Sequence, residues 1–389
     1  MDEKKTPKKI YTAAKLVVSA LVLTGLILGS IRLMGYRIVS GEQFKRYTGI
    51  EKTFGKLYDM KTAADETFLW DFSKNDQMNA LYTALMDSYG DKYTKYLDED
   101  AVKELKEHLN SSFYGIGIQF KDSGDGKFEI VEVVKEGPAD VAGIKKGDLI
   151  KKVDGVSYTD SDKLKEAIRG KLGSNVKLVI EREGKEKEFN VTRGEVSEAT
   201  IDSGILQGNI GYIRIRSFGE NTSKEFDDAI SYMEKKALKG VIIDLRNNPG
   251  GLFESGIDVA DSLLPECNIT YTKTKAKKKE NYNSDEKHTS LKYVLLVNEN
   301  TASSAEVLTA AIKANKGGSI VGTKTFGKGI VQETRLFKDG TGISVTTREY
   351  YAPDGSKIHK KGITPDVEVN LTSDDKEDVQ LLKAISLFS

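Results

Sequence analysis

Short apolar runs alternate with helical patterns over the second half of the chain. Three runs of buried-strand length predict strands at Ile210–Ile215, Val241–Leu245 and Tyr293–Val297. Apolar residues at helical spacing predict helices at Ser223–Ala237, Leu252–Leu264 and Ser303–Asn315. Strands that alternate with helices are typical of α/β domains with some parallel strand pairing. We therefore expect an α/β core in this half of the chain.

The first half has a different pattern. Helices are predicted at Gln77–Tyr89 and, with many charges, at Ala101–Leu109. Two strands at Val176–Arg182 and Glu188–Arg193 are joined by the turn Glu183-Gly184. In the second half, the lysine-rich stretch Lys273–Lys287 is predicted to be an exposed loop.

The amino-terminal segment combines an uncharged apolar run with flanking positive charges. Residues Leu16–Ile31 form the run, lysines precede it, and Arg32 and Arg37 follow it. If the flanking side chains snorkel, Ile10–Tyr36 covers about 30 Å of hydrocarbon. A cleaved signal peptide is the alternative, but no convincing Ala-x-Ala site follows the run. We expect a single-pass anchor at residues 12–36 in a bacterial cell membrane, with residues 1–11 in the cytoplasm and the catalytic part outside.

Composition narrows the function classes. Lys plus Arg and Asp plus Glu each number 59, so the charge balance gives no argument for nucleic-acid binding. The single Cys267 excludes an intramolecular disulfide and a cysteine-based zinc cage, and the sequence has no His-Glu-x-x-His motif. We expect neither a metal nor a cofactor.

A serine at a strand-to-helix turn is the first catalytic candidate. Ser303 follows the predicted strand Tyr293–Val297 and begins a predicted helix, where free N–H groups and the helix dipole favour a developing oxyanion. The alternative is that Ser303 and Glu306 form only a capping box. A nucleophilic serine also needs a base. A Ser-His-Asp triad is poorly supported, because all three histidines lie in charged or polar surroundings: His108, His288 and His359.

A lysine between two glycines is the candidate base. Lys328 has apolar neighbours at Phe326, Ile330 and Val331, and burial among them would lower the pKa of its amine. If this segment is a strand, Lys328, Ile330 and Gln332 share one face, and Gln332 could orient the amine. The alternative is a solvated lysine at a strand edge.

A glycine-rich turn follows the predicted strand Val241–Leu245. Its sequence is Arg246-Asn247-Asn248-Pro249-Gly250-Gly251. A Gly-Gly turn at the carboxyl end of a strand exposes N–H groups that suit an oxyanion. The same residues are also ordinary turn chemistry, and they lack the spacing of a Walker phosphate loop.

These motifs, in their order along the chain, resemble those of the carboxy-terminal processing peptidase family, also called tail-specific proteases. The resemblance covers roughly residue 60 to the end and includes Asp244–Gly251, Ser303–Glu306, Phe326–Gln332, Thr346–Gly355 and Gly362–Asp366. It implies Ser303 as nucleophile, Lys328 as general base and Gln332 as the residue that orients the lysine. It also implies an oxyanion hole from the backbone of Gly250, Gly251 and Ser304. Family members commonly read Ser-Ala-Ser-Glu where this chain reads Ser-Ser-Ala-Glu; the first serine keeps the spacing to Lys328, so we choose Ser303.

Residues 109–195 resemble a PDZ domain. The loop Gly115, Ile116, Gly117 and Ile118 resembles the PDZ loop whose backbone amides bind a terminal carboxylate, and the glycine-rich string from Gly137 to Gly155 is typical of bacterial PDZ modules. Leu164 and Ile168 lie one helical turn apart and could wall the pocket for the last side chain of a peptide. Arg169 ends this helix. It is either a helix-end cation with Gly170 as the C′ residue, or a gating contact to the catalytic core or the peptide.

Together these features predict an α/β (α+β) multi-domain protein. It would have a membrane helix, a helical region at 37–108, a PDZ domain of mixed β-structure with two helices at 109–195, and an α/β Ser-Lys peptidase core at 196–389. The implied function is a serine endopeptidase that recognises protein substrates with apolar carboxyl termini and is gated by its PDZ domain. A catalytically inactive PDZ scaffold is the alternative, against which Lys328 and Gln332 at family spacing argue. A protease with a His-Asp-Ser triad would place its PDZ domain after the serine. A homodimer and a regulatory protein are two further partners that we expect.

Overall fold

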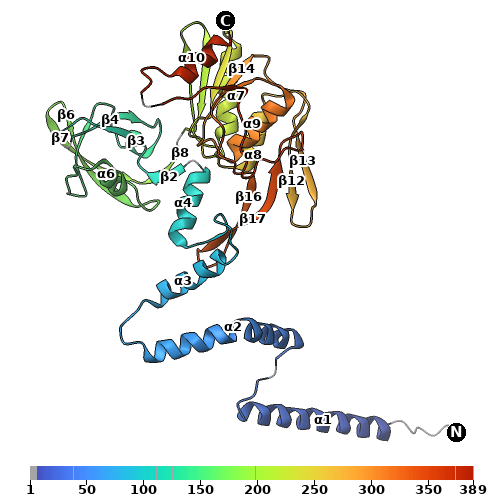
Figure 1. Ribbon diagram of the computed structural model, residues 1–389. Helices are drawn as coiled ribbons and strands as arrows, with labels where there is room; N and C mark the ends of the chain where they lie inside the picture. Colours follow the sequence, from blue (N-terminus) through green and yellow to red (C-terminus); the bar gives the residue numbers. More distant parts are fainter. Residues whose placement is uncertain are drawn as a thin grey trace. The chain divides into compact units, whose positions relative to one another are not determined.

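The structure is a computed structural model that describes residues 7–37, 39–110, 112–124, 127–197, 199–372 and 374–388. The chain divides into two compact units, with the boundary between Gln77 and Met78. The described strands all lie in the second unit (Figure 1). The predicted mixed α/β architecture is confirmed.

The first unit is helical. It contains α1 (Pro7–Leu33) and α2 (Gly41–Thr67), and α3 (Lys74–Asp87) begins near its end. Within α1, Ala14–Leu33 is long and apolar enough to cross a membrane, with a mean hydropathy of 2.1, although a signal sequence meets the same criterion. The helix ends at Leu33, before the predicted end of the span at residue 36, because Gly35 adopts a φ of 82° in the position of a C′ glycine.

The helices α3 and α4 (Glu99–Asn110) begin two to three residues earlier than the predicted helices at Gln77 and Ala101. Polar side chains that precede each helix explain the difference. The Ser73 hydroxyl accepts the N–H of Asp76 at 3.2 Å, and the Asp98 carboxylate accepts the N–H of Ala101 at 2.9 Å. Both contacts satisfy N–H groups that have no partner within the helix.

The predicted PDZ region forms a five-stranded antiparallel sheet. Its strands pair in chain order: β3 (Ile118–Asp122), β4 (Phe128–Val133), β5 (Leu149–Val153), β6 (Asn175–Arg182) and β7 (Lys185–Thr192). Two helices accompany them, α5 (Pro138–Val141) and α6 (Ser161–Ile168), and a ribbon of β2 (Ser112–Gly115) and β8 (Gly194–Ser197) joins the two ends of the region. The predicted turn between β6 and β7 has φ values of 55° at Glu183 and 73° at Gly184, as a type I′ hairpin requires.

A six-stranded sheet forms the α/β core, in the order β18-β15-β14-β11-β10-β9. The strands are β9 (Ile201–Leu206), β10 (Ile210–Ile215), β11 (Gly240–Asp244), β14 (Tyr293–Val297), β15 (Ser319–Gly322) and β18 (Val367–Glu368). All neighbours pair in parallel except β9 with β10. The predicted strands Ile210–Ile215 and Tyr293–Val297 therefore coincide with β10 and β14.

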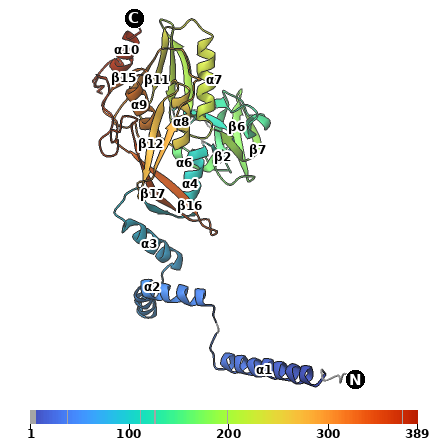
Figure 2. The same cartoon turned by 90° about the vertical axis from the view of Figure 1, so that its right-hand side faces the viewer.

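Helices cover both faces of this sheet (Figures 1 and 2). They are α7 (Thr222–Glu234), α8 (Phe253–Asp261), α9 (Ser304–Asn315) and α10 (Val379–Ser386). Ile243 and Leu295 belong to one buried cluster with α7, α8 and α9, whereas Ile242 and Val294 belong to another with Ala384 of α10. Because β11 and β14 are buried on both faces, their sequences are continuous apolar runs.

A second sheet carries strands from distant parts of the chain. It has the order β1-β17-β12-β13, and β16 also pairs with β17. The strands are β1 (Lys95–Leu97), β12 (Asn268–Thr274), β13 (Lys279–Asn283), β16 (Ile330–Leu336) and β17 (Gly342–Tyr351). The prediction of a loop over Lys273–Lys287 is therefore wrong in its first part, where a hairpin joins β12 and β13. Lysines on a short edge strand make its sequence resemble that of an exposed loop, although its backbone still pairs with the neighbouring strand.

Candidate active site

Ser303 lies in a strained turn between β14 and α9. It is the N-cap residue of α9, with φ 58° and ψ −122°. Positive φ is uncommon for a residue with a side chain, and strain of this kind clusters at functional sites. Two hydrogen bonds join this turn to the glycine-rich turn that follows β11. Ala302 donates its N–H to the Asn248 carbonyl, and the Thr301 hydroxyl donates to the Leu245 carbonyl, both at 2.9 Å. Two of the three predicted motifs therefore meet at one edge of the sheet.

The two adjacent serines differ in exposure. Ser303 is half-buried, whereas Ser304 is only 1% exposed and its hydroxyl has no hydrogen-bond partner among the described residues. A Cβ placed on Gly256 of α8 would lie 2.9 Å from the Ser304 Cβ, so the Ser304 side chain packs against α8. This packing favours Ser303 as the serine that a substrate can reach.

The Gly250-Gly251 turn lies directly against Ser303. Gly250 has a φ of 97°, and a Cβ there would lie 2.6 Å from the Ser303 Cβ and 3.0 Å from the Ser304 nitrogen. Only glycine fits this approach. The N–H of Gly250 donates to Asn248 Oδ1 at 2.8 Å, whereas the N–H groups of Gly251 and Ser304 donate to no acceptor within the described part of the chain. Of the three predicted oxyanion donors, these two are available, and Gly250 contributes space.

Glu306 connects the serine turn to the lysine segment. It is fully buried, and one of its oxygens accepts the N–H groups of Ser303 at 3.0 Å and Lys328 at 2.7 Å. The other oxygen accepts the Thr325 hydroxyl at 2.6 Å and the N–H of Gly327 at 2.7 Å. Burial raises the pKa of this carboxyl, and the hydrogen bonds oppose that shift. From the sequence, Glu306 is predicted only as a capping residue: its spacing from Ser303 indicates the bond to the Ser303 N–H but not the bonds to the lysine segment.

Lys328 is half-buried and sits in the loop before β16. Burial lowers the pKa of its amine, and the nearby cations Lys95 and Lys92 lower it further. The amine lies 4.9 Å from the centroid of the Tyr93 ring and, among the described residues, makes no hydrogen bond to Ser303. The Tyr350 hydroxyl approaches the backbone carbonyls of both Ser303, at 2.9 Å, and Lys328. The backbones of the two candidate residues are thus fixed together, while the lysine amine rests on an aromatic ring.

Gln332 lies in β16, but the expected shared strand face is absent. The strand begins at Ile330, so Lys328 precedes it, and a bulge falls between Val331 and Gln332. A bulge breaks the alternation of side chains along a strand, so the spacing of Lys328 and Gln332 does not place them on one face. The Gln332 amide donates to the Thr346 hydroxyl at 3.3 Å. Its role in orienting Lys328 stays a prediction.

An ionic network at the end of β11 supports the glycine-rich turn. The Arg246 guanidinium pairs with Asp244 at 2.6 Å and with Asp378, the N-cap of α10, at 2.8 Å. The Tyr212 hydroxyl donates to Asp244 at 2.8 Å. The hydrogen bond and charge of Arg246 hold the pKa of Asp378 below its usual range, against the effect of burial. Buried charges that are paired in this way fix the strand end from which the turn departs.

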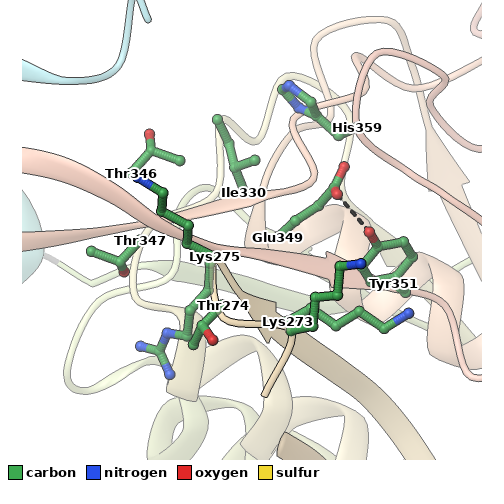
Figure 3. Close-up of a pocket in the computed structure, with 11 residues that line it drawn as sticks. Lys273, Thr274, Lys275, Ile330, Thr346, Thr347, Glu349, Tyr351 and His359 are labelled. Atoms are coloured by element: carbon green, nitrogen blue, oxygen red, sulfur yellow. Dashed lines mark hydrogen bonds between the residues drawn. The ribbon is translucent and has the colours of Figure 1, made fainter. Parts of the chain in front are cut away.

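A pocket of about 800 Å³ lies on the second sheet (Figure 3). Neither Ser303 nor Lys328 is among the residues that line it. It is lined by Lys273, Glu349, Tyr351, His359 and residues around them, and Tyr351 donates to Glu349 at 2.5 Å. His359 lies beside the lysine segment, since a Cβ on Gly329 would lie 2.4 Å from its backbone nitrogen. Neither His288 nor His359 hydrogen-bonds to Ser303 in the described structure. The serine turn therefore remains the candidate active site.

A cavity in the PDZ region lies beside several of the residues predicted to bind a peptide. This cavity of about 750 Å³ is lined by Ile116, Gly117, Ile118, Ile168 and Arg169, together with residues of β4 and α6, Asp202 of β9, and Arg216, which follows β10. The lining residues do not include Leu164, which is 1% exposed and packs in the hydrophobic core of this region. The α6 residues on the groove are Ser161, Asp162, Lys165 and Ile168, on the helix face next to that of Leu164.

The end of α6 departs from the predicted C′ glycine. Arg169 has extended backbone angles of φ −69° and ψ 161°, and Gly170 is absent from the residues with positive φ. Instead, Arg193 donates to the carbonyls of Ile168 at 2.8 Å and Ala167 at 2.9 Å. A Cβ on Gly170 would lie 2.7 Å from the Arg193 guanidinium, so Gly170 provides room for it. The helix-end cation is therefore Arg193, and Arg169 lines the groove.

Among the described residues, no group of three or more His, Cys, Asp or Glu side chains could hold a metal ion.

Residues 209–369 match the model of peptidase family S41, and residues 115–192 match that of the PDZ domain. The carboxy-terminal processing protease CtpA of Bacillus subtilis (strain 168) is 35% identical over 377 residues, which cover 95% of this chain and 78% of that protein. A probable CtpA-like serine protease of Staphylococcus aureus (strain N315) is 31% identical over 379 residues, or 95% of this chain and 75% of that protein.

A solved structure, the photosystem II D1 C-terminal processing protease, aligns over 89% of this chain and 97% of that chain, with 24% identity and a TM-score of 0.49. The identity to these relatives over 95% of this chain confirms the predicted resemblance and does not favour an inactive scaffold. The chain belongs to the carboxy-terminal processing serine proteases of peptidase family S41.

Proposed function

We propose that this protein is a membrane-anchored serine endopeptidase in which Ser303 is the nucleophile, Lys328 the general base and Gln332 the residue that orients the lysine. The observation that supports this most strongly is the Glu306 link. One carboxylate binds the backbone N–H groups of both Ser303 and Lys328, and the lysine amine is half-buried with a lowered pKa. A neutral lysine close to a strained serine is a base close to a nucleophile.

The reaction would proceed in two halves. The neutral amine of Lys328 takes the proton of Ser303 as Oγ bonds to the scissile carbonyl carbon, and the N–H groups of Gly251 and Ser304 stabilise the oxyanion. The tetrahedral intermediate collapses, and the leaving amine takes the proton from Lys328. Water then attacks the acyl-enzyme ester with Lys328 again as base, and Ser303 Oγ leaves the acyl carbon and takes the proton back from Lys328. Since the amine rests on Tyr93 in this structure, it must move toward Ser303 before the first step.

The direct test compares hydrolysis of a protein with an apolar carboxyl-terminal tail by the purified wild type and by Ser303→Ala. Cleavage by the wild type alone would support the proposal. Equal cleavage by both would contradict the assignment of Ser303.

We also infer that the PDZ region recognises the tail of the substrate. Its groove contains the glycine-rich loop at Gly117, where backbone amides suit a carboxylate, and the apolar Ile168 beside it. Asp202 and Arg216 of the core also line this groove. A tail bound there would stabilise an active arrangement only if it binds that arrangement more tightly. Arg169, which lines the same groove, is our candidate for the gating contact.

Amidation of the substrate's carboxyl terminus should weaken cleavage by about tenfold, because it removes the carboxylate that the backbone amides bind. Arg169→Ala should lower turnover of the same tailed substrate more than it lowers thermal stability. Initial rates and melting temperatures of wild type, Arg169→Ala and the exposed control Lys171→Ala would measure both effects. Unchanged rates with the amidated substrate would exclude tail capture, and an unchanged rate for Arg169→Ala would exclude the gate.

The amino-terminal helix supports a membrane location. Ala14–Leu33 is apolar and unburied, and basic residues precede it. We propose that residues 12–36 form an uncleaved single-pass anchor with the amino terminus in the cytoplasm. The regions 37–108, 109–195 and 196–389 would then act outside the membrane as helical region, PDZ domain and peptidase core.

The full-length protein is therefore expected to pellet with membranes, and protease added outside intact cells should digest its catalytic part. Immunoblots of fractionated cells, with an epitope tag at each end of the chain, would measure both properties. A cytoplasmic marker protein that stays intact is the control. Release of a shortened soluble form that begins after residue 30 would identify the segment as a signal peptide.

A further inference from the structure

A short segment outside both family matches covers the proposed base. Residues Lys95–Leu97 form β1, which pairs antiparallel with Gly342–Ser344 of β17. Just before it, the buried Thr94 hydroxyl accepts the N–H of Thr346 at 3.1 Å. The segment is therefore fixed to the sheet that also carries β16, which begins at Ile330, two residues after Lys328.

Tyr93 presents its ring to two lysines. The amines of Lys328 and Lys92 each lie 4.9 Å from the centroid of this ring, and that of Lys92 also lies 5.4 Å from the ring of Phe326. Asp91 fixes the backbone beneath the ring. Its carboxylate accepts the N–H of Tyr93 at 3.3 Å and the hydroxyl of Thr94 at 2.7 Å. The position of the ring is thus set by local hydrogen bonds and by the sheet, independently of Lys328.

We propose that Tyr93 is a positioning residue for Lys328: its ring shields the amine from water beside the cations Lys92 and Lys95, which keeps the amine neutral and able to act as a base. The inference rests on the proposed role of Lys328. It adds a residue from the amino-terminal side of the PDZ domain to a site whose other parts all follow that domain. The effect depends on the ring of Tyr93 rather than on its hydroxyl, because the Lys328 amine lies over the ring face.

The groups around Lys328 favour the neutral amine on balance. Burial is the main cause of its lowered pKa, followed by Lys95 and Lys92, whereas Asp91 and Glu306 act in the opposite direction. The oxygens of Glu306 are already occupied by four donors, and those of Asp91 by its own turn. Two further titratable residues lie by this segment: the Tyr350 hydroxyl contacts the Lys328 carbonyl, and the His359 backbone lies against Gly329. An aromatic face also attracts an ammonium, but this attraction is smaller than the cost of removing a charge from water.

Competitive labelling can measure the protonation of Lys328 without any catalysis. The full-length protein carrying Ser303→Ala would be treated with trace acetic anhydride across a pH series, and the acetylation of Lys328 quantified by peptide mass spectrometry. The exposed Lys324 in the same loop serves as the internal reference. Only the neutral amine reacts, so the midpoint of the labelling curve reports the pKa of Lys328.

Tyr93→Phe should leave the midpoint unchanged, whereas Tyr93→Ala should raise it by about one pH unit, because water can then reach the ammonium. Tyr93→Leu, which keeps much of the side-chain volume, should give a smaller rise and tests the same effect if the alanine variant is unstable. In the protein that retains Ser303, the acid limb of kcat/KM should move to higher pH by the same amount.

The charged neighbours provide a second set of variants. Replacing Lys92 and Lys95 together by Gln should raise the midpoint by about half a unit at low salt and by less in 1 M salt, since exposed charges are screened. Replacing both by Arg should leave it unchanged.

Midpoints that stay at the wild-type value in Tyr93→Ala, Tyr93→Leu and the double Gln variant, at unchanged melting temperature, would overturn the inference. This outcome is separate from failure of the proposed function, for which Ser303→Ala or Lys328→Ala would have to retain turnover.

Discussion

Ser303→Ala and Lys328→Ala should each lower kcat/KM for a tailed protein substrate by roughly 10³-fold or more, since one removes the nucleophile and the other its base. The two residues act as one unit, so the double variant should be no slower than either single variant. Both proteins should unfold near the wild-type temperature, because the Lys328 amine makes no hydrogen bond among the described residues. Stopped-time assays and thermal melts would measure these effects.

The matched controls lie beside each residue. Ser304→Ala removes a buried hydroxyl without a partner, and Lys324→Ala removes an exposed lysine from the same loop as Lys328. Both should keep most of the activity. The pH profile adds an independent check: burial and nearby cations lower the pKa of Lys328, and the neutral amine is the active form. Wild-type kcat/KM should therefore rise with pH through that lowered pKa and then level off. Turnover that survives in Ser303→Ala and disappears in Ser304→Ala would move the nucleophile by one residue.

The parts of the fold that follow from contiguous residues could be predicted from the sequence. The runs that became β11 and β14 are almost entirely apolar, because helices cover both faces of the sheet there. Ser303 and the Gly250-Gly251 turn come directly after two such strands, whose carboxyl ends are neighbours in a parallel sheet. Their proximity follows from that topology, and the structure brings them into contact.

The parts that depend on pairing between distant segments could not be predicted. The bulge at Val331 and Gln332 arises from the register of β16 against β17, which no local pattern reveals. Arg193 reaches the end of α6 only because β7 ends there, so the local sequence pointed to Arg169 instead. Tyr93 likewise meets Lys328 through the pairing of β1 with β17. In each case, strand pairing brings together two residues that lie far apart in the sequence.

Glu306 is where the local and the distant information meet. Its spacing from Ser303 indicates a capping box, and Ser303 does donate its N–H to the carboxylate. The three additional donors come from Thr325, Gly327 and Lys328, on a loop that the sequence does not place beside α9. Replacing a capping glutamate on the surface would change stability little, whereas Glu306 is a buried acceptor for four donors.

Glu306→Gln should lower kcat/KM nearly as far as Ser303→Ala and should reduce the free energy of unfolding by about 2–4 kcal/mol. Each carboxylate oxygen accepts two donors, so an amide nitrogen in either position places a donor against two donors. Glu306→Asp should fail for a different reason, because its shorter side chain cannot reach both the serine turn and the lysine loop. Kinetic assays and urea unfolding of each variant would measure the two effects.

The control for this prediction is Glu299→Gln, which alters an exposed glutamate that accepts one hydrogen bond, from Thr323 at 2.9 Å. It should change neither quantity measurably, since an exposed amide can exchange that bond for water. If Glu306→Gln were as active and as stable as this control, the carboxylate would not hold the two catalytic backbones together. If it were stable but inactive, the link would matter for the geometry of Ser303 and Lys328 rather than for folding, because the loop would remain attached through Tyr350, which also contacts both backbones.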